Sequence, residues 1–132
     1  MNRRRHTLRD ERGQTMVEFA LVVPILCIVL FGIFQFGALY NDYVTVTDAT
    51  RVGARKAAVS RHEVSPEGVA ETAARNSASG LTPAKLKIKV TATGWEHGDA
   101  VTVEATYPYS INLLGVVVKT GTLKSQTTER VE

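Results

Sequence analysis

Hydrophobic and polar positions follow three different patterns along this chain, and the first is a nearly continuous apolar run. It extends over 22 residues, from Phe19 to Tyr40, and Gln35 is its only strongly polar side chain. At about 1.5 Å per residue, a helix of this length measures roughly 33 Å, against a hydrocarbon thickness of about 30 Å. The run therefore predicts one membrane-spanning helix at about residues 19–40.

A buried helix of a soluble protein and a secretory signal peptide are the two other interpretations of this run. A buried helix in a soluble protein would need protein on every side, and fewer than about a hundred residues remain to supply it. A secretory signal peptide also has a basic region before an apolar stretch. This run, however, is too long for such a peptide, and no small-x-small cleavage site precedes Asn41. A membrane span is favoured over both.

Three residues inside the run are typical helix breakers, namely Pro24, Gly32 and Gly37. Membrane helices tolerate such residues where neighbouring helices or local adjustments satisfy the backbone, and small residues let another helix approach closely. The three are therefore candidate helix-packing positions. The spacing from Gly32 to Gly37 does not match the four-residue dimer motif.

The second pattern is a helical seam beyond the run, with members alternately four and three residues apart. These are Leu39, Tyr43, Val46, Thr50, Gly53 and Ala57. The spacing predicts that the helix continues as a stalk to about residue 61, packing either on a partner or on its own domain. A basic outer face, best interpreted as solvated, is formed by Arg51, Arg55, Lys56 and Arg61.

A short alanine-rich helix is expected next. Ser65 is a good N-cap, Pro66 suits the first helical position, and Gly80 fits the stop. Pro83 prevents this helix from continuing further.

The third pattern is strict alternation, which predicts strands. Between Lys85 and Thr93, apolar residues alternate with lysines, and a loop at 94–99 leads to a return strand that repeats the alternation from Val101 to Tyr107. Pro108 predicts that this strand ends there or lies at an edge. After a turn at 111–115, one or two more strands are expected. The fold class is therefore α+β, with a long membrane helix and stalk, a short helix and a small antiparallel sheet.

The charge distribution sets the expected orientation. The formal net charge of +3 comes entirely from residues 1–13, which hold five arginines, one aspartate and one glutamate. A basic nucleic-acid-binding surface is therefore not indicated. Because the arginines flank the N-terminal side of the span, the N-terminus is expected in the cytoplasm and residues 62–132 outside the membrane.

Catalytic, metal-binding and cofactor-binding motifs are missing from the sequence. The histidines, at positions 6, 62 and 97, have no ligand spacing, and Cys27 has no partner cysteine. No nucleophile elbow, zinc-protease, Walker or dinucleotide-binding motif occurs. The chain is predicted not to be an enzyme and to need no cofactor or metal. The loop that holds His97 is interpreted as a surface turn, and Trp95 either covers a small core or contacts a partner.

Gly13 and Glu18 pose a separate question, because an ordinary membrane anchor needs neither. Near the membrane edge Glu18 can reach water at small cost, which leaves it without a function. In the other interpretation, cleavage after Gly13 makes Gln14 a new N-terminus, whose amine shares one helix end with Glu18. In a staggered bundle, the carboxylate of one subunit can then meet the amine of a neighbour.

The start of the chain resembles the processing site of type IV-type prepilins. A basic leader comes first, then Gly13, then Gln14-Thr15-Met16-Val17-Glu18-Phe19, and then the apolar helix. The spelling G-Q-x-x-V-E-F-A-L-V-x-P, with the later V-G-A-R-K-A-A-V, is similar to TadE-like proteins of tight-adherence (Flp) pilus systems. The resemblance implies cleavage after Gly13 by a prepilin peptidase, assembly and recognition through Glu18 and Phe19, and a pilin-like fold. It also implies an inner-membrane location, with other pilin subunits and the assembly platform as partners.

The resemblance divides the chain into a leader at 1–13, a long helix at 14–61 and an outer domain at 62–132. The chain left after cleavage is longer than a typical major Flp pilin, which implies a minor pilin or pseudopilin. The main alternative is a single-span membrane protein whose outer domain binds a ligand or partner without any pilus role. A secreted enzyme released by signal peptidase is a third hypothesis, which nothing catalytic supports.

Overall fold

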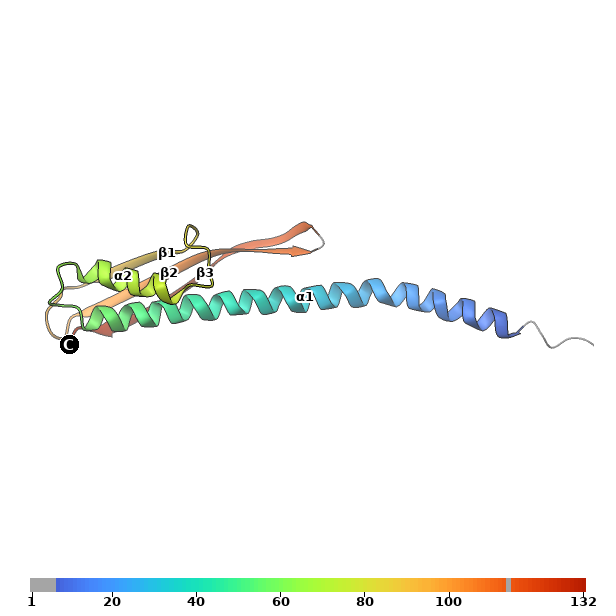
Figure 1. Ribbon diagram of the computed structural model, residues 1–132, viewed down its shortest axis with the longest axis horizontal. Helices are drawn as coiled ribbons and strands as arrows, with labels where there is room; N and C mark the ends of the chain where they lie inside the picture. Colours follow the sequence, from blue (N-terminus) through green and yellow to red (C-terminus); the bar gives the residue numbers. More distant parts are fainter. Residues whose placement is uncertain (1–6, 114) are drawn as a thin grey trace, which may run out of the picture. The chain divides into compact units, whose positions relative to one another are not determined.

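The protein contains two helices and one three-stranded antiparallel sheet, in the chain order α1, α2, β1, β2, β3 (Figure 1). The computed structural model describes residues 7–113 and 115–132, with side chains from residue 13 onward. His6 and the first part of the basic leader lie outside the described residues. The chain divides into two compact units, one up to residue 36 and one over residues 37–132. The α+β fold class is confirmed.

Helix α1 spans Thr7–Ala58, so it begins before Gln14 and ends three residues before the expected limit at 61. Its end is fixed by local hydrogen bonds, because the Ser60 N–H donates to the Ala57 carbonyl at 3.0 Å and the Ser60 hydroxyl donates to the Lys56 carbonyl. Pro24 lies inside the helix, where it lacks an N–H to donate.

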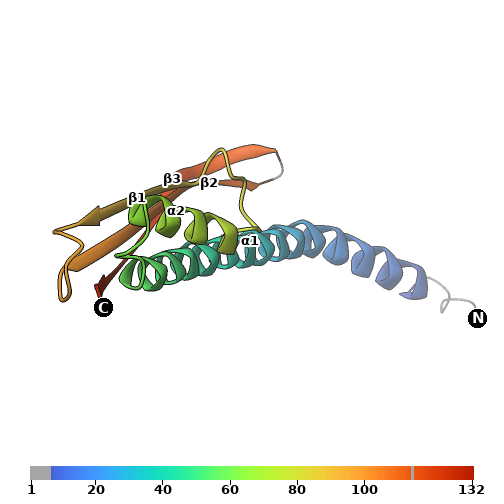
Figure 2. The same ribbon diagram turned by 60° about the vertical axis from the view of Figure 1, so that its left-hand side comes forward.

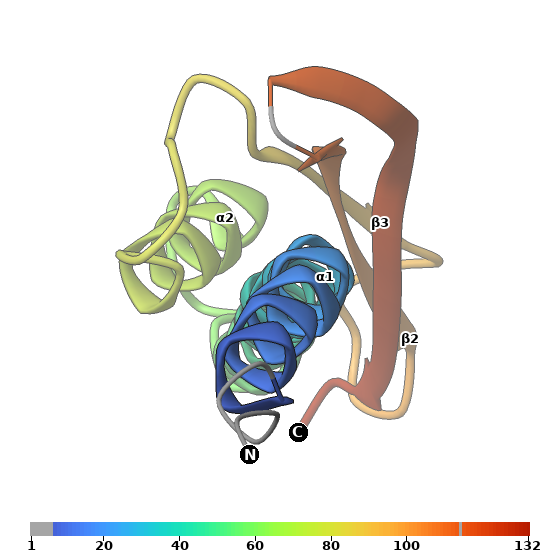
Figure 3. The ribbon, with the colours of Figure 1, turned by 90° about the vertical axis from the view of Figure 1, so that its right-hand side faces the viewer.

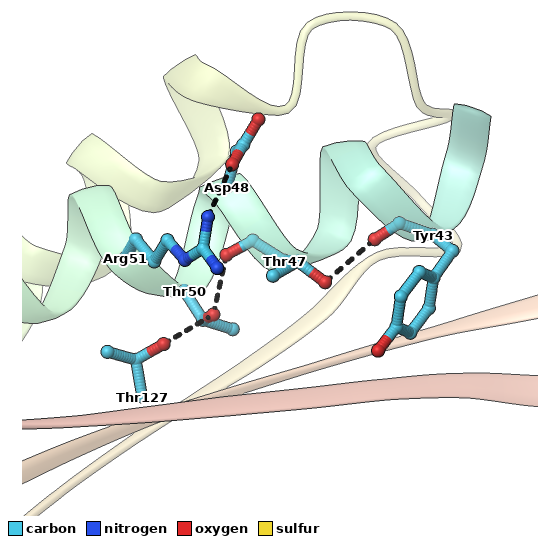
Figure 4. Close-up of polar contacts among 6 residues, drawn as sticks. All are labelled: Tyr43, Thr47, Asp48, Thr50, Arg51 and Thr127. Carbon is cyan, nitrogen blue, oxygen red and sulfur yellow. Dashed lines mark hydrogen bonds and ion pairs between the residues drawn. The ribbon is translucent and has the colours of Figure 1, made fainter. Parts of the chain in front are cut away.

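The predicted seam is the face by which the end of α1 packs on its own domain. Val46, Thr50, Gly53 and Ala57 are buried, whereas Leu39 is half-buried and Tyr43 is exposed. Thr50 is anchored to the sheet, since its hydroxyl lies 2.9 Å from the Thr127 hydroxyl and donates to the Thr47 carbonyl at 2.7 Å (Figure 4). Arg51 stays on the exposed outer face and pairs with Asp48 at 3.5 Å.

Helix α2 spans Pro66–Ser77 and is capped as the sequence predicts. The Ser65 hydroxyl accepts the Gly68 N–H at 3.3 Å, and Pro66 occupies the first turn. The prediction for its end is wrong, because the helix stops before Gly80, at Ser77. The N–H of Ala78 donates to the Arg75 carbonyl, and the chain then turns so that Ala78 and Leu81 both enter the core.

Strand β1 spans Lys87–Ala92 and pairs with residues 101–106 of β2. The predicted alternation is confirmed, because Leu86, Ile88, Val90 and Ala92 pack toward the core while Lys87 and Lys89 are exposed. The strand is one edge of the sheet. Lysines on such an edge disfavour pairing with another chain.

Strand β2 spans Ala100–Leu113 and β3 spans Val116–Arg130, so the last segment forms a single strand. Pro108 does not end β2, and the turn expected at 111–115 is shorter, because residues 111–113 belong to the strand. Proline is tolerated at this point because β1 pairs no further than Thr106. At Pro108, β2 is therefore an edge on the side away from β3, which agrees with the second half of the prediction.

The core is a thin layer between the sheet and the helices, α2 and the C-terminal part of α1, which cover the same face (Figure 3). One cluster contains Val46, Leu86 and Tyr107, and a second contains Ala57, Val101 and Val131. Backbone hydrogen bonds hold the last two residues in place. The Val131 N–H donates to the Asp99 carbonyl at 2.8 Å, and the Glu132 N–H donates to the Ala58 carbonyl at 2.9 Å.

Candidate processing and assembly site

The candidate residues Gly13, Gln14, Glu18 and Phe19 lie on consecutive turns of α1, and all four are exposed. The Gln14 amide donates to a Glu18 carboxylate oxygen at 3.1 Å, one helical turn away. Among the residues whose side chains are described, no lysine, arginine or histidine forms an ion pair with Glu18. The carboxylate is therefore exposed and has no cation partner in the described part of this chain.

Gly13 has no packing role in the described structure. A β-carbon added to Gly13 would meet nothing within 4 Å, and the same holds for Gly32 and Gly37. Glycine inside a helix costs roughly 1 kcal/mol relative to alanine. These three glycines therefore weaken α1 without relieving a close contact within the described chain.

The apolar run forms one exposed hydrophobic helix surface, which includes Pro24. Its most apolar 18-residue window has a mean hydropathy of 2.7, and none of that window is buried. The soluble-core interpretation requires the opposite. By length and composition, α1 is the one helix in the described part of the chain that can cross a membrane. Large exposed hydrophobic residues along it include Leu21, Ile25, Phe31, Ile33, Phe34 and Phe36.

The loop between β1 and β2 forms a turn. The Asp99 carboxylate accepts the Glu96 N–H at 2.9 Å, and Gly98 has a positive φ of 93°. Trp95 is half-buried against the second core cluster, which supports its role as a cover of the core. His97 is exposed, and no group of three metal-ligating side chains occurs among the described residues.

One exposed apolar surface, at the far end of the β2–β3 hairpin, is not predicted by the sequence pattern. Val116, Val117 and Val118 are all exposed there, although they belong to a strand. The signal was present as three consecutive valines after Gly115, whose φ is 88°. A run of valines predicts a strand but does not indicate which side of that strand is covered.

One comparison with known families gives a match, and the matching segment lies within α1. Residues 13–55 match the family model described as TadE-like protein. The segment is similar to TadE-like proteins, and the match covers less than half of the chain. The predicted resemblance is confirmed, and it covers Gly13, Glu18, the apolar run and most of the seam. No curated protein and no solved structure gives a significant match to the chain.

The TadE-like match over this segment supports a pilin-like protein associated with tight-adherence pili. The matching segment begins at Gly13 and stops before α2. The family match therefore describes the helix, whereas the outer domain is described by its own structure alone. The apolar helix of the TadE-like segment supports membrane anchoring.

Proposed function

We propose that this chain is a minor pilin or pseudopilin of a tight-adherence pilus system, cleaved after Gly13 by a membrane prepilin peptidase. In this proposal, residues 1–13 are a cytoplasmic leader, residues 14–61 assemble with other pilin subunits, and residues 62–132 lie outside the inner membrane. The pilus assembly platform and the lipid bilayer are the other partners.

The exposed Glu18 is the observation that carries the proposal. A carboxylate on an apolar helix without a cation is costly when the helix enters lipid, and the cost falls only near the membrane edge or beside a positive partner. Among the described residues, the Gln14 amide donates a hydrogen bond to it, and no cation pairs with it. A cation from another subunit would satisfy the carboxylate, and cleavage after Gly13 would create one, the free amine of residue 14.

The pairing between subunits would set register more than stability. The attraction between amine and carboxylate is offset by the loss of water from both ions. An unpaired carboxylate in lipid remains unfavourable, so bundles with the wrong axial stagger are selected against. Phe19, exposed beside Glu18, would pack against the neighbouring helix in the correct stagger.

Gly13 supports cleavage because no contact within the described chain requires a glycine there. A peptidase that must draw the backbone into its active site benefits from a residue without a side chain. Gly13→Val should therefore block cleavage in cells with active prepilin peptidase. Gly37→Val is the matched control, because the structure leaves equal space at that glycine and the proposal gives it no role in cleavage.

The experiment measures the mass of the protein in membranes that contain the peptidase. A mature form beginning at Gln14, lost in Gly13→Val and retained in Gly37→Val, supports cleavage. A full-length chain in cells with active prepilin peptidase contradicts it.

A second experiment tests assembly. Glu18→Gln should insert into the membrane and be cleaved, yet enter pili much less often than the wild type. Asp48→Asn is the matched control, since it removes an exposed carboxylate from the same helix outside the span. Equal incorporation of Glu18→Gln and wild type would favour the alternative, a single-span protein whose outer domain binds a partner without a pilus role.

A further inference from the structure

We propose that the hairpin end, residues 108–113 of β2 and 116–118 of β3, enters the outer interfacial layer of the bilayer that α1 spans. This inference rests on the membrane span in the proposed function, but not on cleavage or on a pilus role. It assigns a lipid-contacting surface to the outer domain, in addition to the helix.

The hairpin end is apolar and exposed. Val116, Val117 and Val118 have relative exposures of 67%, 56% and 64%. No charged residue occurs from Pro108 to Val118, and the first one afterward is Lys119. A lysine beside an apolar segment can keep its ammonium group among lipid headgroups while its stem lies along the apolar surface.

The hairpin end extends past the rest of the sheet (Figure 2). Strand β1 pairs only as far as Thr106, so beyond that residue β3 is the only strand paired with β2 in the described chain. A two-stranded ribbon is marginally stable in water unless an apolar face is covered. A membrane interface would supply that cover.

Within residues 37–132, the core contacts set the direction in which the hairpin end extends along α1. Val101 shares a core cluster with Ala57, and Tyr107 shares one with Val46, so β2 runs antiparallel to α1. The hairpin end therefore extends in the direction of Tyr40, where the span ends.

The lengths bring the hairpin end to membrane level. A β-carbon on Gly53 would lie 3.2 Å from Val103, which fixes one shared level on helix and strand. From that level, the helix reaches Tyr40 in about 20 Å, and β2 reaches Leu113 in about 33 Å. Even if strand and helix were inclined by about 50°, the hairpin end would reach the level of Tyr40.

Apolar side chains occur on both faces of the hairpin end. Leu113 opposes Val116 on the face that continues the core, whereas Val117 opposes Asn112 on the other face. A hairpin that packs against one protein surface needs only one apolar face. Lipid surrounds an inserted hairpin, so apolar residues on both faces favour lipid as the occupant.

Tyrosines lie near the expected membrane boundary on both helix and hairpin. Tyr40 and Tyr43 are exposed on α1, and Tyr109 lies on β2 just before the hairpin end. Tyrosines gather where lipid meets water. Depth is limited, because the outer backbone edges of a two-stranded ribbon need water. The hairpin end therefore enters the interface and not the hydrocarbon centre.

The test uses the full chain in phosphatidylcholine vesicles with an environment-sensitive fluorophore on a single cysteine. Native Cys27 reports the span. In a Cys27→Ala background, Val117→Cys reports the hairpin end, and Gln126→Cys, an exposed position farther along β3, is the matched control. Lipids carrying a nitroxide near the headgroup quench probes that enter the interface.

We expect the Val117→Cys probe to emit at shorter wavelength and to be quenched several-fold more strongly than the Gln126→Cys probe. If Cys27 reports a span while Val117→Cys matches Gln126→Cys, the inference is wrong and the membrane span stands. If Val117→Cys is shielded from water without quenching by the nitroxide lipid, a protein contact replaces the lipid contact. If Cys27 reports no bilayer either, the membrane span itself fails.

Discussion

Gly53 on α1 lies so close to Ala74 on α2 that a β-carbon added to Gly53 would be 3.0 Å from the Ala74 β-carbon. The same added carbon would lie 3.2 Å from Val103 on β2 and 3.3 Å from the Ala70 carbonyl. Both helices and the sheet therefore meet at one glycine. Its absent side chain sets the distance between the three elements.

Gly53→Ala should destabilise the outer domain, because two of the three contacts involve a helix β-carbon and a backbone carbonyl that cannot rotate away. Overpacking of this kind costs about 1–3 kcal/mol, of which roughly 1 kcal/mol is offset by the better helix propensity of alanine. Thermal unfolding in detergent measures the effect. Gly37→Ala on the same helix has open space and should not lower the melting temperature.

Thr50→Val should destabilise the contact between α1 and β3. Because the single Thr50 hydroxyl proton is used on the Thr47 carbonyl, the Thr127 hydroxyl donates to Thr50. The substitution leaves Thr127 without this acceptor, at a cost of about 1–3 kcal/mol. Denaturant unfolding should show part of this stability restored in Thr50→Val/Thr127→Val. Equal stability of Thr50→Val and the exposed control Thr45→Val would contradict the assignment.

Ser65→Ala should weaken the start of α2. The Ser65 hydroxyl accepts the Gly68 N–H, and loss of an N-cap costs about 1 kcal/mol. Ser65→Asp keeps an acceptor and should retain most of the stability, whereas Ser79→Ala changes an exposed serine beyond the helix and should have little effect. Hydrogen exchange of the first-turn amides measures the difference, and unchanged exchange in Ser65→Ala would refute the cap.

Gly121→Val should displace the Tyr109 ring from the hairpin. The two residues are cross-strand partners, and a β-carbon on Gly121 would lie 2.7 Å from the tyrosine ring. The ring can rotate, so the stability loss should be modest, about 1 kcal/mol. Ring-current shifts in NMR spectra report the displacement. Gly80→Val, at an open glycine, should leave the Tyr109 signals in place.

The sequence correctly predicted the helix and strands in which one face is buried, because burial of one face sets the spacing of the apolar side chains. The alternation from Leu86 to Ala92 and from Val101 to Tyr107 placed the correct side chains in the core, and the seam from Val46 to Ala57 identified the buried side of α1. These patterns succeed because each strand or helix has one wet side and one dry side, which the side-chain period must follow.

The failures occurred where a residue depends on partners far away in the chain. Pro108 is acceptable inside β2 only because β1 ends at Thr106, which β2 alone does not reveal. Helix α2 ends before Gly80 because Leu81 must reach the core. Gly13 and Glu18 remain predictions for another reason, since the partners proposed for them belong to other molecules and no fold of a single chain tests them.

The burial of Val131 in the second core cluster, beside Ala57, has a consequence for biogenesis. Residues from the end of α1 and from the C-terminal end of the outer domain complete the same cluster, and the Glu132 N–H donates to the Ala58 carbonyl. For an outer domain on the far side of a membrane, secretion of nearly its whole length must precede closure of this cluster. Until then the newly exported chain exposes uncovered strands, which makes the export stage the period when it is most open to proteases and chaperones.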